Sequence, residues 1–226
     1  RLIARIAPAV AKAAMDSGVA TRPIADLKAY AEKLTEFVYK TSLFMRPVFN
    51  QARKEIKRIV LTEGEDERVL HAAQHVASHK LAFPILVGDG KLIEERIAAQ
   101  GLTIQAGKDY ELIDIKNNPH YEESWKAYYS LRKRQGVTEE MARRRLKANS
   151  TLVGALMVKL GHADGLVCGT MGRFHDHFAV MEEVIGYNNP EKEAFAMNAL
   201  ISNKGNFFIA DTYINENPTA EQLAKG

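Results

Sequence analysis

Residues 149–172 constrain the fold more than any other part of the chain, because they predict a fully buried helix followed by a buried strand. Apolar residues at 152–160 cover almost every direction around a helix axis, which is typical of a helix without a solvent-facing side. Asn149 suits the hydrogen-bonded cap at the start of this helix, and Gly161 suits its left-handed end. The short apolar run 163–168 then predicts a strand covered on both faces.

The loop at residues 169–175, directly after this strand, is the predicted place for a ligand. In open α/β sheets, ligands bind beyond the carboxyl ends of the strands. Gly169 and Thr170 begin the loop and are therefore candidate ligand-binding residues. Cys168 ends the strand, and we interpret it as a small buried side chain, since no histidine is placed by sequence to activate its thiol.

The preceding part of the chain alternates between strand and helix patterns, which predicts an α/β fold with a mostly parallel sheet flanked by helices. Several helices are expected within residues 121–160, and two more apolar strands follow the central one. The predicted strands are 59–61, 83–87, 110–115, 195–201 and 207–211, and the predicted intervening helices are 69–77 and 92–99.

The N-terminal region differs, because it carries helical patterns without a strand. Apolar stripes occur at residues 2–14, 24–38 and 44–49, with Pro8 and Pro47 inside the first and third stripes. They predict either an arm that joins two bodies or a helical subdomain of one body, and the sequence favours neither.

Charge and composition exclude several classes of protein. The 226 residues are 46% hydrophobic, enough for one large domain or two lobes, and the net charge of +3 comes from 31 basic and 28 acidic residues mixed along the chain. This balance indicates neither nucleic-acid nor membrane binding. No apolar run reaches the roughly 18 residues of a membrane span, and a single cysteine favours a reducing compartment, so we expect a cytoplasmic protein.

Two arginines are candidates for binding an anion. Arg132 follows a stripe of aromatic residues on the same helix face, so it either binds an anion or satisfies the end of its own helix. Arg145 lies on the apolar side of its helix and predicts a specific ligand or a buried ion pair. Arg143 and Lys147 point together in another direction, which favours a solvated face. The aromatic stripe consists of Tyr121, Trp125, Tyr128 and Tyr129.

Other polar motifs predict less chemistry. The turn at residues 63–68 is too acidic to attract a phosphate, and Asp66 or Glu65 is expected to cap the following helix. No nucleotide-binding glycine motif occurs. His175 and His177 would point in different directions on a strand or a helix, so no metal site is predicted.

Several motifs resemble the phosphate acetyltransferase family in the family's order. They cover residues 56–226 and include KRIVLTEGEDER at 57–68 and FIADTYINENPTAEQL at 208–223. Ahead of them, residues 8–34 are similar to the tail of the nicotinamide-binding domain of bacterial malic enzymes. The chain therefore resembles the C-terminal part of a multidomain malic enzyme. The absent initiator methionine and the helix pattern running up to Gly226 predict that both ends are cut.

The resemblance implies a two-lobed fold of the phosphate acetyltransferase and isocitrate dehydrogenase type, preceded by a helical arm. The implied segments are residues 1–23 as the end of the nicotinamide-binding domain, 24–54 as the arm, 55–148 as the first lobe and 149–226 as an incomplete second lobe.

The resemblance also implies that Arg132 binds an anion. Ala179 and Val180 stand where the acetyltransferases have an Arg-Pro pair, and their remaining catalytic serine, aspartate and arginine would lie beyond Gly226. Without these groups, acetyl transfer loses transition-state stabilisation, so no catalytic residue is predicted in this chain.

These implications predict a regulatory and oligomerising part of a malic enzyme, which converts malate to pyruvate with NADP or NAD and Mg²⁺ or Mn²⁺ in a separate catalytic domain. Acetyl-CoA is the expected effector, contacted by Arg132, Arg145, Gly169 and Thr170. The expected partners are the catalytic domain and further copies of the chain. The alternatives are an active phosphate acetyltransferase and a dimerisation scaffold without a ligand.

Overall fold

A computed structural model describes residues 3–188, 193–202 and 204–225, which form two compact units. One unit comprises residues 51–194, and the other comprises residues 1–50 with 195–226. The parallel sheet and the pocket described below lie in the first of these units.

The sheet has four strands in the order β3-β2-β1-β4. Every pair of neighbours is parallel, as predicted, and β1 pairs with both β2 and β4. Because β4 lies on the opposite side of β1 from β2, the direction of strand addition reverses between β1 and β4. The strands are β1 (Arg58–Leu61), β2 (Phe83–Gly88), β3 (Glu111–Asp114) and β4 (Gly165–Val167).

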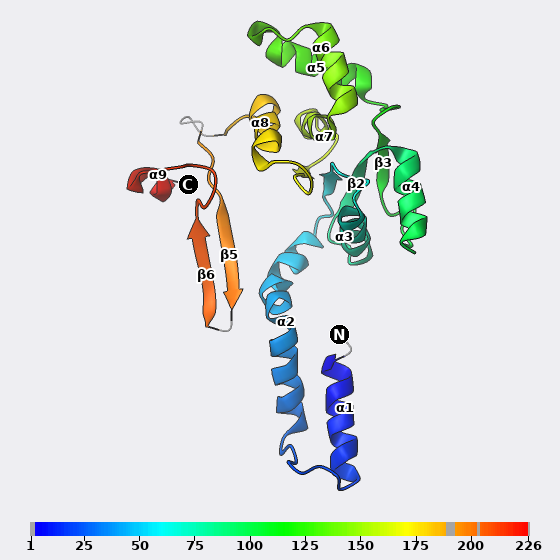
Figure 1. The fold of residues 1–226 in the computed structure, drawn as a ribbon, viewed down its shortest axis with the longest axis vertical. Coiled ribbons are helices and arrows are strands. Elements are labelled where there is room, and N and C mark those ends of the chain that lie inside the picture. The colour runs from blue at the N-terminus through cyan, green and yellow to red at the C-terminus, as the bar shows by residue number, and fades with distance from the viewer. Residues whose placement is uncertain (1–2, 189–192, 203, 226) are drawn as a thin grey trace. The chain divides into compact units, whose positions relative to one another are not determined.

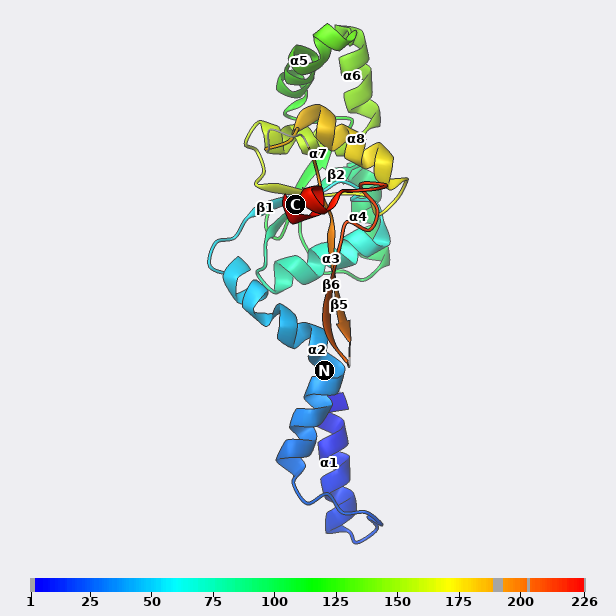
Figure 2. The same cartoon turned by 90° about the vertical axis from the view of Figure 1, so that its left-hand side faces the viewer.

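Helices cover both faces of the sheet, which confirms the predicted α/β class (Figure 1). Strand β2 shows the division, because Ile85 and Val87 pack in one cluster with Leu156, whereas Leu86 packs in the other with Leu70. Figure 2 shows the paired α5 and α6 beyond α7. On one face lie α3 (Glu67–Ser78) and α4 (Gly90–Ala99), and on the other α5 (Tyr121–Arg132), α6 (Glu139–Ala148), α7 (Ser150–Lys159) and α8 (Phe174–Val184).

Helix α7 is buried on all sides, as its sequence predicts. Seven consecutive residues, from Thr151 to Met157, are buried. The Asn149 side chain accepts a hydrogen bond from the Leu152 backbone N–H at 2.9 Å, which confirms the predicted cap. Gly161 has a positive φ of 81°, which allows the left-handed turn after the helix.

Gly154 lets α7 approach the sheet closely. A Cβ atom at this position would lie 2.8 Å from Thr62 Cγ2 and 2.9 Å from Leu166 Cδ1. Thr62 follows β1 and Leu166 belongs to β4, so a larger residue would push the helix away from both strands.

The basic face of α6 differs from the prediction. Arg143 and Lys147 do point together, but their cationic groups cover aromatic rings rather than facing solvent alone. Arg143 Cζ lies 3.6 Å from the Trp125 ring centroid, and Lys147 Nζ lies 5.3 Å from that of Tyr121. The predicted aromatic stripe on α5 is confirmed, because Trp125 and Tyr128 are buried. The two helices are joined by the short 3-10 helix η1 (Lys133–Gln135).

The second unit contains two long helices and a hairpin. Helix α1 (Ile3–Asp16) includes Pro8, and α2 (Leu27–Ala52) runs continuously through Pro47, so the prediction of two separate helices over α2 is wrong. A proline removes one helical hydrogen bond and bends a helix without having to end it. No helix in the described ranges is both long and apolar enough to cross a membrane.

The two strands predicted after the central one pair with each other. Strands β5 (Met197–Ser202) and β6 (Gly205–Ala210) form an antiparallel sheet of their own, and α9 (Ala220–Lys225) follows. The expected boundary between lobes, at residues 148 and 149, falls inside the compact unit of residues 51–194. Since β4 pairs with β1, residues 149–184 belong to the same body as the expected first lobe.

Replacing Gly154 by valine should test the contact between α7 and the sheet. The added carbons have no room, so the free energy of unfolding should fall by about 2–3 kcal/mol. Chemical denaturation measures this change. The matched change Ser130→Val on the exposed side of α5 should alter it by less than about 0.5 kcal/mol. Equal effects of the two substitutions would contradict close packing at Gly154.

Candidate functional site

A cavity of about 620 Å³ lies at the carboxyl edge of the parallel sheet. Its lining includes the segments that follow β1 and β2, the loop after β4 and the start of α7. Ligands of open α/β sheets bind where the order of strand addition reverses, which here is the edge between β1 and β4. The cavity is lined by residues 62–66, 87, 88, 96, 115, 147–151, 171, 172 and 177.

The N-terminus of α7 opens into this cavity. Asn149 caps the Leu152 N–H group, whereas the N–H groups of Ser150 and Thr151 have no acceptor in the described part of the chain. Unpaired N–H groups and the helix dipole favour an anion at such a position. Thr62 also lines the cavity, and its buried Oγ1 has no hydrogen-bond partner among the described residues.

Two cations reach the same cavity, Arg96 from α4 and Lys147 from α6. Arg96 Nη1 donates to the backbone carbonyl of Glu65, and Lys147 lies over the Tyr121 ring. Neither forms an ion pair with a carboxylate within the described ranges. Both therefore keep charge available for an anionic ligand.

The acidic turn after β1 contributes three carboxylates to the cavity lining, those of Glu63, Glu65 and Asp66, and each already accepts a hydrogen bond. Glu63 Oε1 accepts from the Gly169 N–H at 3.0 Å, and Glu65 Oε1 accepts from the Asp89 N–H at 2.6 Å. Asp66 caps α3, which confirms one of the two predicted caps. Its hydrogen bonds to Arg68 lower the pKa of the Asp66 carboxyl to about 2.

His177 fixes the loop after β4 against α7. Its Nδ1 lies 2.8 Å from Thr151 Oγ1 and 3.7 Å from Glu63 Oε1, and its Nε2 lies 2.6 Å from the Met171 carbonyl oxygen. In the sequence, His177 stands out only as a possible metal ligand. Its positioning contacts come from distant segments, so no local pattern could have indicated them.

The predicted residues Gly169 and Thr170 lie directly before the cavity-lining Met171 without lining the cavity themselves. Gly169 has a positive φ of 93° and donates its N–H to Glu63. The Thr170 carbonyl accepts a hydrogen bond from Arg68 Nη2 at 3.1 Å. In this structure both residues hold the loop in place.

Neither Arg132 nor Arg145 lines the cavity. The two arginines lie near each other, because the charges of both act on the Tyr128 phenol. Arg145 forms an ion pair with Glu183 at 3.1 Å and donates to the Tyr128 hydroxyl, but this pair is partly exposed rather than buried. Burial raises the pKa of Tyr128 to about 12. Arg132 Nε is buried without a hydrogen-bond partner in the described part of the chain.

Cys168, Ala179 and Val180, which the sequence also singles out, lie in the loop after β4 and in α8. Cys168 is half-buried, and burial raises the pKa of its thiol, which makes the reactive thiolate less available. Val180 packs in the core, and Ala179 is exposed.

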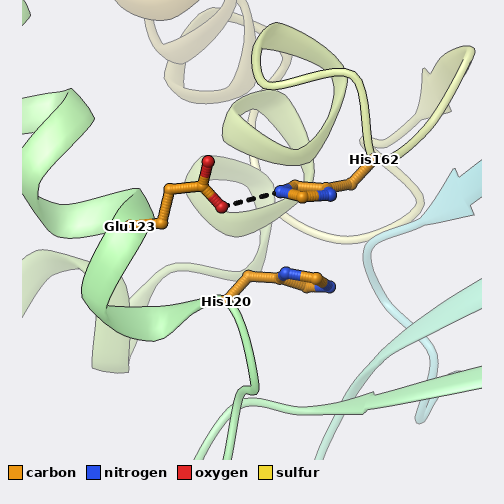
Figure 3. A group of neighbouring side chains, drawn as sticks. All are labelled: His120, Glu123 and His162. Atoms are coloured by element: carbon orange, nitrogen blue, oxygen red, sulfur yellow. Dashed lines mark hydrogen bonds and ion pairs between the residues drawn. The ribbon is translucent and has the colours of Figure 1, made fainter.

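A second group of polar side chains lies outside the cavity lining, and no sequence pattern predicts it. His120, Glu123 and His162 place potential ligand atoms within 4.8 Å of one another (Figure 3). His162 Nε2 lies 2.9 Å from Glu123 Oε2, and the two imidazole rings stack with their centroids 4.0 Å apart. His120 and Glu123 are close in sequence, but only the fold brings His162 to them.

Comparison with known proteins adds evidence of family membership. Over its whole length the chain is 57% identical to the NADP-dependent malic enzyme of Salmonella typhimurium and 56% identical to that of Escherichia coli. It spans only 30% of the length of each. A crystal structure of a phosphotransacetylase from Streptococcus pyogenes matches with a TM-score of 0.69 and 26% identity, covering 80% of this chain and 55% of that one.

The family model of the phosphate acetyl/butaryl transferases matches residues 43–225. This match covers most of the chain, including the parallel sheet and the cavity. The chain therefore belongs to the phosphate acetyl/butaryl transferase family.

Proposed function

We propose that this chain is the C-terminal regulatory and oligomerising part of a malic enzyme. Its high identity to NADP-dependent malic enzymes, over 30% of their length, supports this assignment. In this proposal, a catalytic domain elsewhere in the protein converts malate to pyruvate with NADP or NAD and Mg²⁺ or Mn²⁺. The present chain supplies regulation rather than the reacting groups.

The proposed effector is acetyl-CoA, bound in the cavity at the carboxyl edge of the sheet. The single observation that supports this most is the open N-terminus of α7 beside two cations without carboxylate partners in the described ranges, Arg96 and Lys147. The helix start and the cations favour the phosphates of the acyl carrier. The acidic turn and Thr62 offer acceptors for its hydroxyl and amino groups.

Regulation requires acetyl-CoA to bind one arrangement of the full protein more tightly than another. The cavity joins the loop after β4 to the starts of α3 and α7, so an occupied cavity would favour one position of that loop. The arm at residues 24–54, most of which forms α2, leads directly into β1 and is the proposed connection to the catalytic domain.

An active phosphate acetyltransferase is the second candidate, favoured by the family match. It requires a guanidinium to stabilise developing charge, and Ala179 and Val180 offer none. Formation of acetyl phosphate from acetyl-CoA and phosphate by the full-length protein would support this candidate over a regulatory role.

Replacing Lys147 by alanine should weaken acetyl-CoA binding to the full-length protein about tenfold, the loss expected for a charged phosphate contact of about 1.4 kcal/mol. Isothermal titration calorimetry measures the affinity, and malate turnover without acetyl-CoA should not change. Lys91→Ala, on the exposed side of α4 and outside the cavity lining, is the matched control and should bind normally.

The variant Arg132→Ala distinguishes acetyl-CoA binding in the cavity from binding at Arg132, the residue predicted by sequence. A loss of affinity in Arg132→Ala alone would indicate that acetyl-CoA binds at the end of α5 instead. A loss in both Arg132→Ala and Lys147→Ala would indicate a site that includes the cavity and the end of α5. Unchanged affinity after Lys147→Ala would contradict binding beside α7. No measurable heat with the unmodified protein would favour a scaffold without a ligand.

Association with further copies of the chain is a related proposal, supported by the hairpin of β5 and β6. Large apolar side chains on both of its strands are exposed, including Met197 at 70% and Phe208 at 61%. A two-stranded sheet is marginally stable alone, so such a surface favours a covering partner.

Replacing Phe208 by aspartate should lower the molar mass of the full-length protein in solution, because a buried charge without a partner disfavours association. Size-exclusion chromatography with light scattering measures this mass. Asn206→Asp introduces the same charge at an exposed polar position of β6 and should leave the mass unchanged. An unchanged mass in both variants would show that the hairpin does not form the contact between subunits.

A further inference from the structure

We propose that His120, Glu123 and His162 bind a transition-metal dication of the Zn²⁺ class. None of these residues lines the large cavity, so this would be a separate site. A bound ion would join the start of α5 to the connection between α7 and β4. This inference does not depend on acetyl-CoA binding.

The fold places the three side chains together through two rigid elements. His120 directly precedes α5, and its carbonyl accepts a hydrogen bond from the Ser124 N–H at 2.9 Å. Glu123 lies in the first turn of the same helix, so it shares a side with His120 (Figure 3). His162 follows the left-handed turn at Gly161, after the buried helix α7.

The donor atoms fit a borderline metal better than a hard one. Two imidazole nitrogens with one carboxylate form a ligand set known for zinc with a fourth position open to water, whereas Mg²⁺ and Ca²⁺ prefer oxygen ligands. Zinc bonds of about 2.0–2.1 Å in a tetrahedron require ligand atoms roughly 3.3 Å apart. The present separations, all within 4.8 Å, can reach this value by side-chain rotation.

His120 is the residue that an ordinary surface ion pair leaves unexplained. Glu123 and His162 already form a pair at 2.9 Å, whereas the ring nitrogens of His120 make no hydrogen bond in the described part of the chain. Because stacked rings direct their lone pairs side by side, the His120 ring must turn when the ion binds.

Equilibrium dialysis of the full-length protein against Zn²⁺, with excess Mg²⁺ to occupy sites for hard ions, tests the proposal. The variants His120→Ala and His162→Ala should each bind one Zn²⁺ per chain fewer than the unmodified protein. His175→Ala removes an exposed histidine of α8 outside the cluster and is the matched control, which should retain the full number.

Glu123→Gln distinguishes a loss of Zn²⁺ binding caused by the missing ligand from one caused by misfolding. Glutamine can still accept a hydrogen bond from His162 but lacks the carboxylate charge. It should weaken Zn²⁺ binding at least tenfold, with an unchanged melting temperature in the presence of a chelator. Equal Zn²⁺ numbers and affinities in the unmodified protein and all three cluster variants would overturn the proposal. Equal losses in the His175→Ala control would also overturn it.

Discussion

The close approach of α7 to the parallel sheet is the contact on which the rest of the larger unit depends. Gly154 provides the space, since even one added carbon would lie within 3 Å of Thr62 and Leu166. Those two residues belong to neighbouring segments around β1 and β4, so one helix holds both sides of the strand reversal together. Close packing of this kind is sensitive to volume because a protein interior has little free space.

This contact also determines where the cavity and the His120 cluster lie. With α7 held across the sheet, its N-terminus lies at the carboxyl edge, where Thr151 contacts His177 and the loop after β4 closes the cavity. The opposite end of α7 leads through Gly161 to His162 and the cluster with His120. The two ends of one buried helix thus provide an environment for an anion and a set of ligands for a cation.

Much of the fold could be predicted from local sequence. The all-round apolar pattern of α7, its Asn149 cap and the positions of the parallel strands depend on residue types at short spacing, and these predictions are confirmed. The prediction that the strand after α7 is covered on both faces is wrong, because β4 lies at the edge of the sheet and Val167 is exposed. The predicted α/β class and the resemblance to phosphate acetyltransferases also agree with the structure and the family match. Local pattern could not show that β4 returns to β1, since strand pairing depends on contacts far apart in sequence.

The site was less accessible to sequence analysis for the same reason. The loop after β4 lines the cavity through Met171 and Gly172, whereas the sequence pattern favours a solvated Lys147 and predicts no role for Arg96. Periodicity gives the direction of a side chain around its own helix, without showing which segment faces it. Arg145 illustrates this limit, because its pattern predicts a ligand or a buried ion pair but cannot show that Glu183 of α8 lies beside it.

The late return of β4 has a consequence for how the protein folds. Strands β1, β2 and β3 follow one another closely, whereas β4 joins β1 only after the long helical segment that contains α5, α6 and α7. Joining such distant segments costs loop-closure entropy and slows folding. We therefore expect the three sequential strands to assemble early and the edge between β1 and β4 to form late. An effector at that edge would then slow unfolding most by delaying the detachment of the last strand to join.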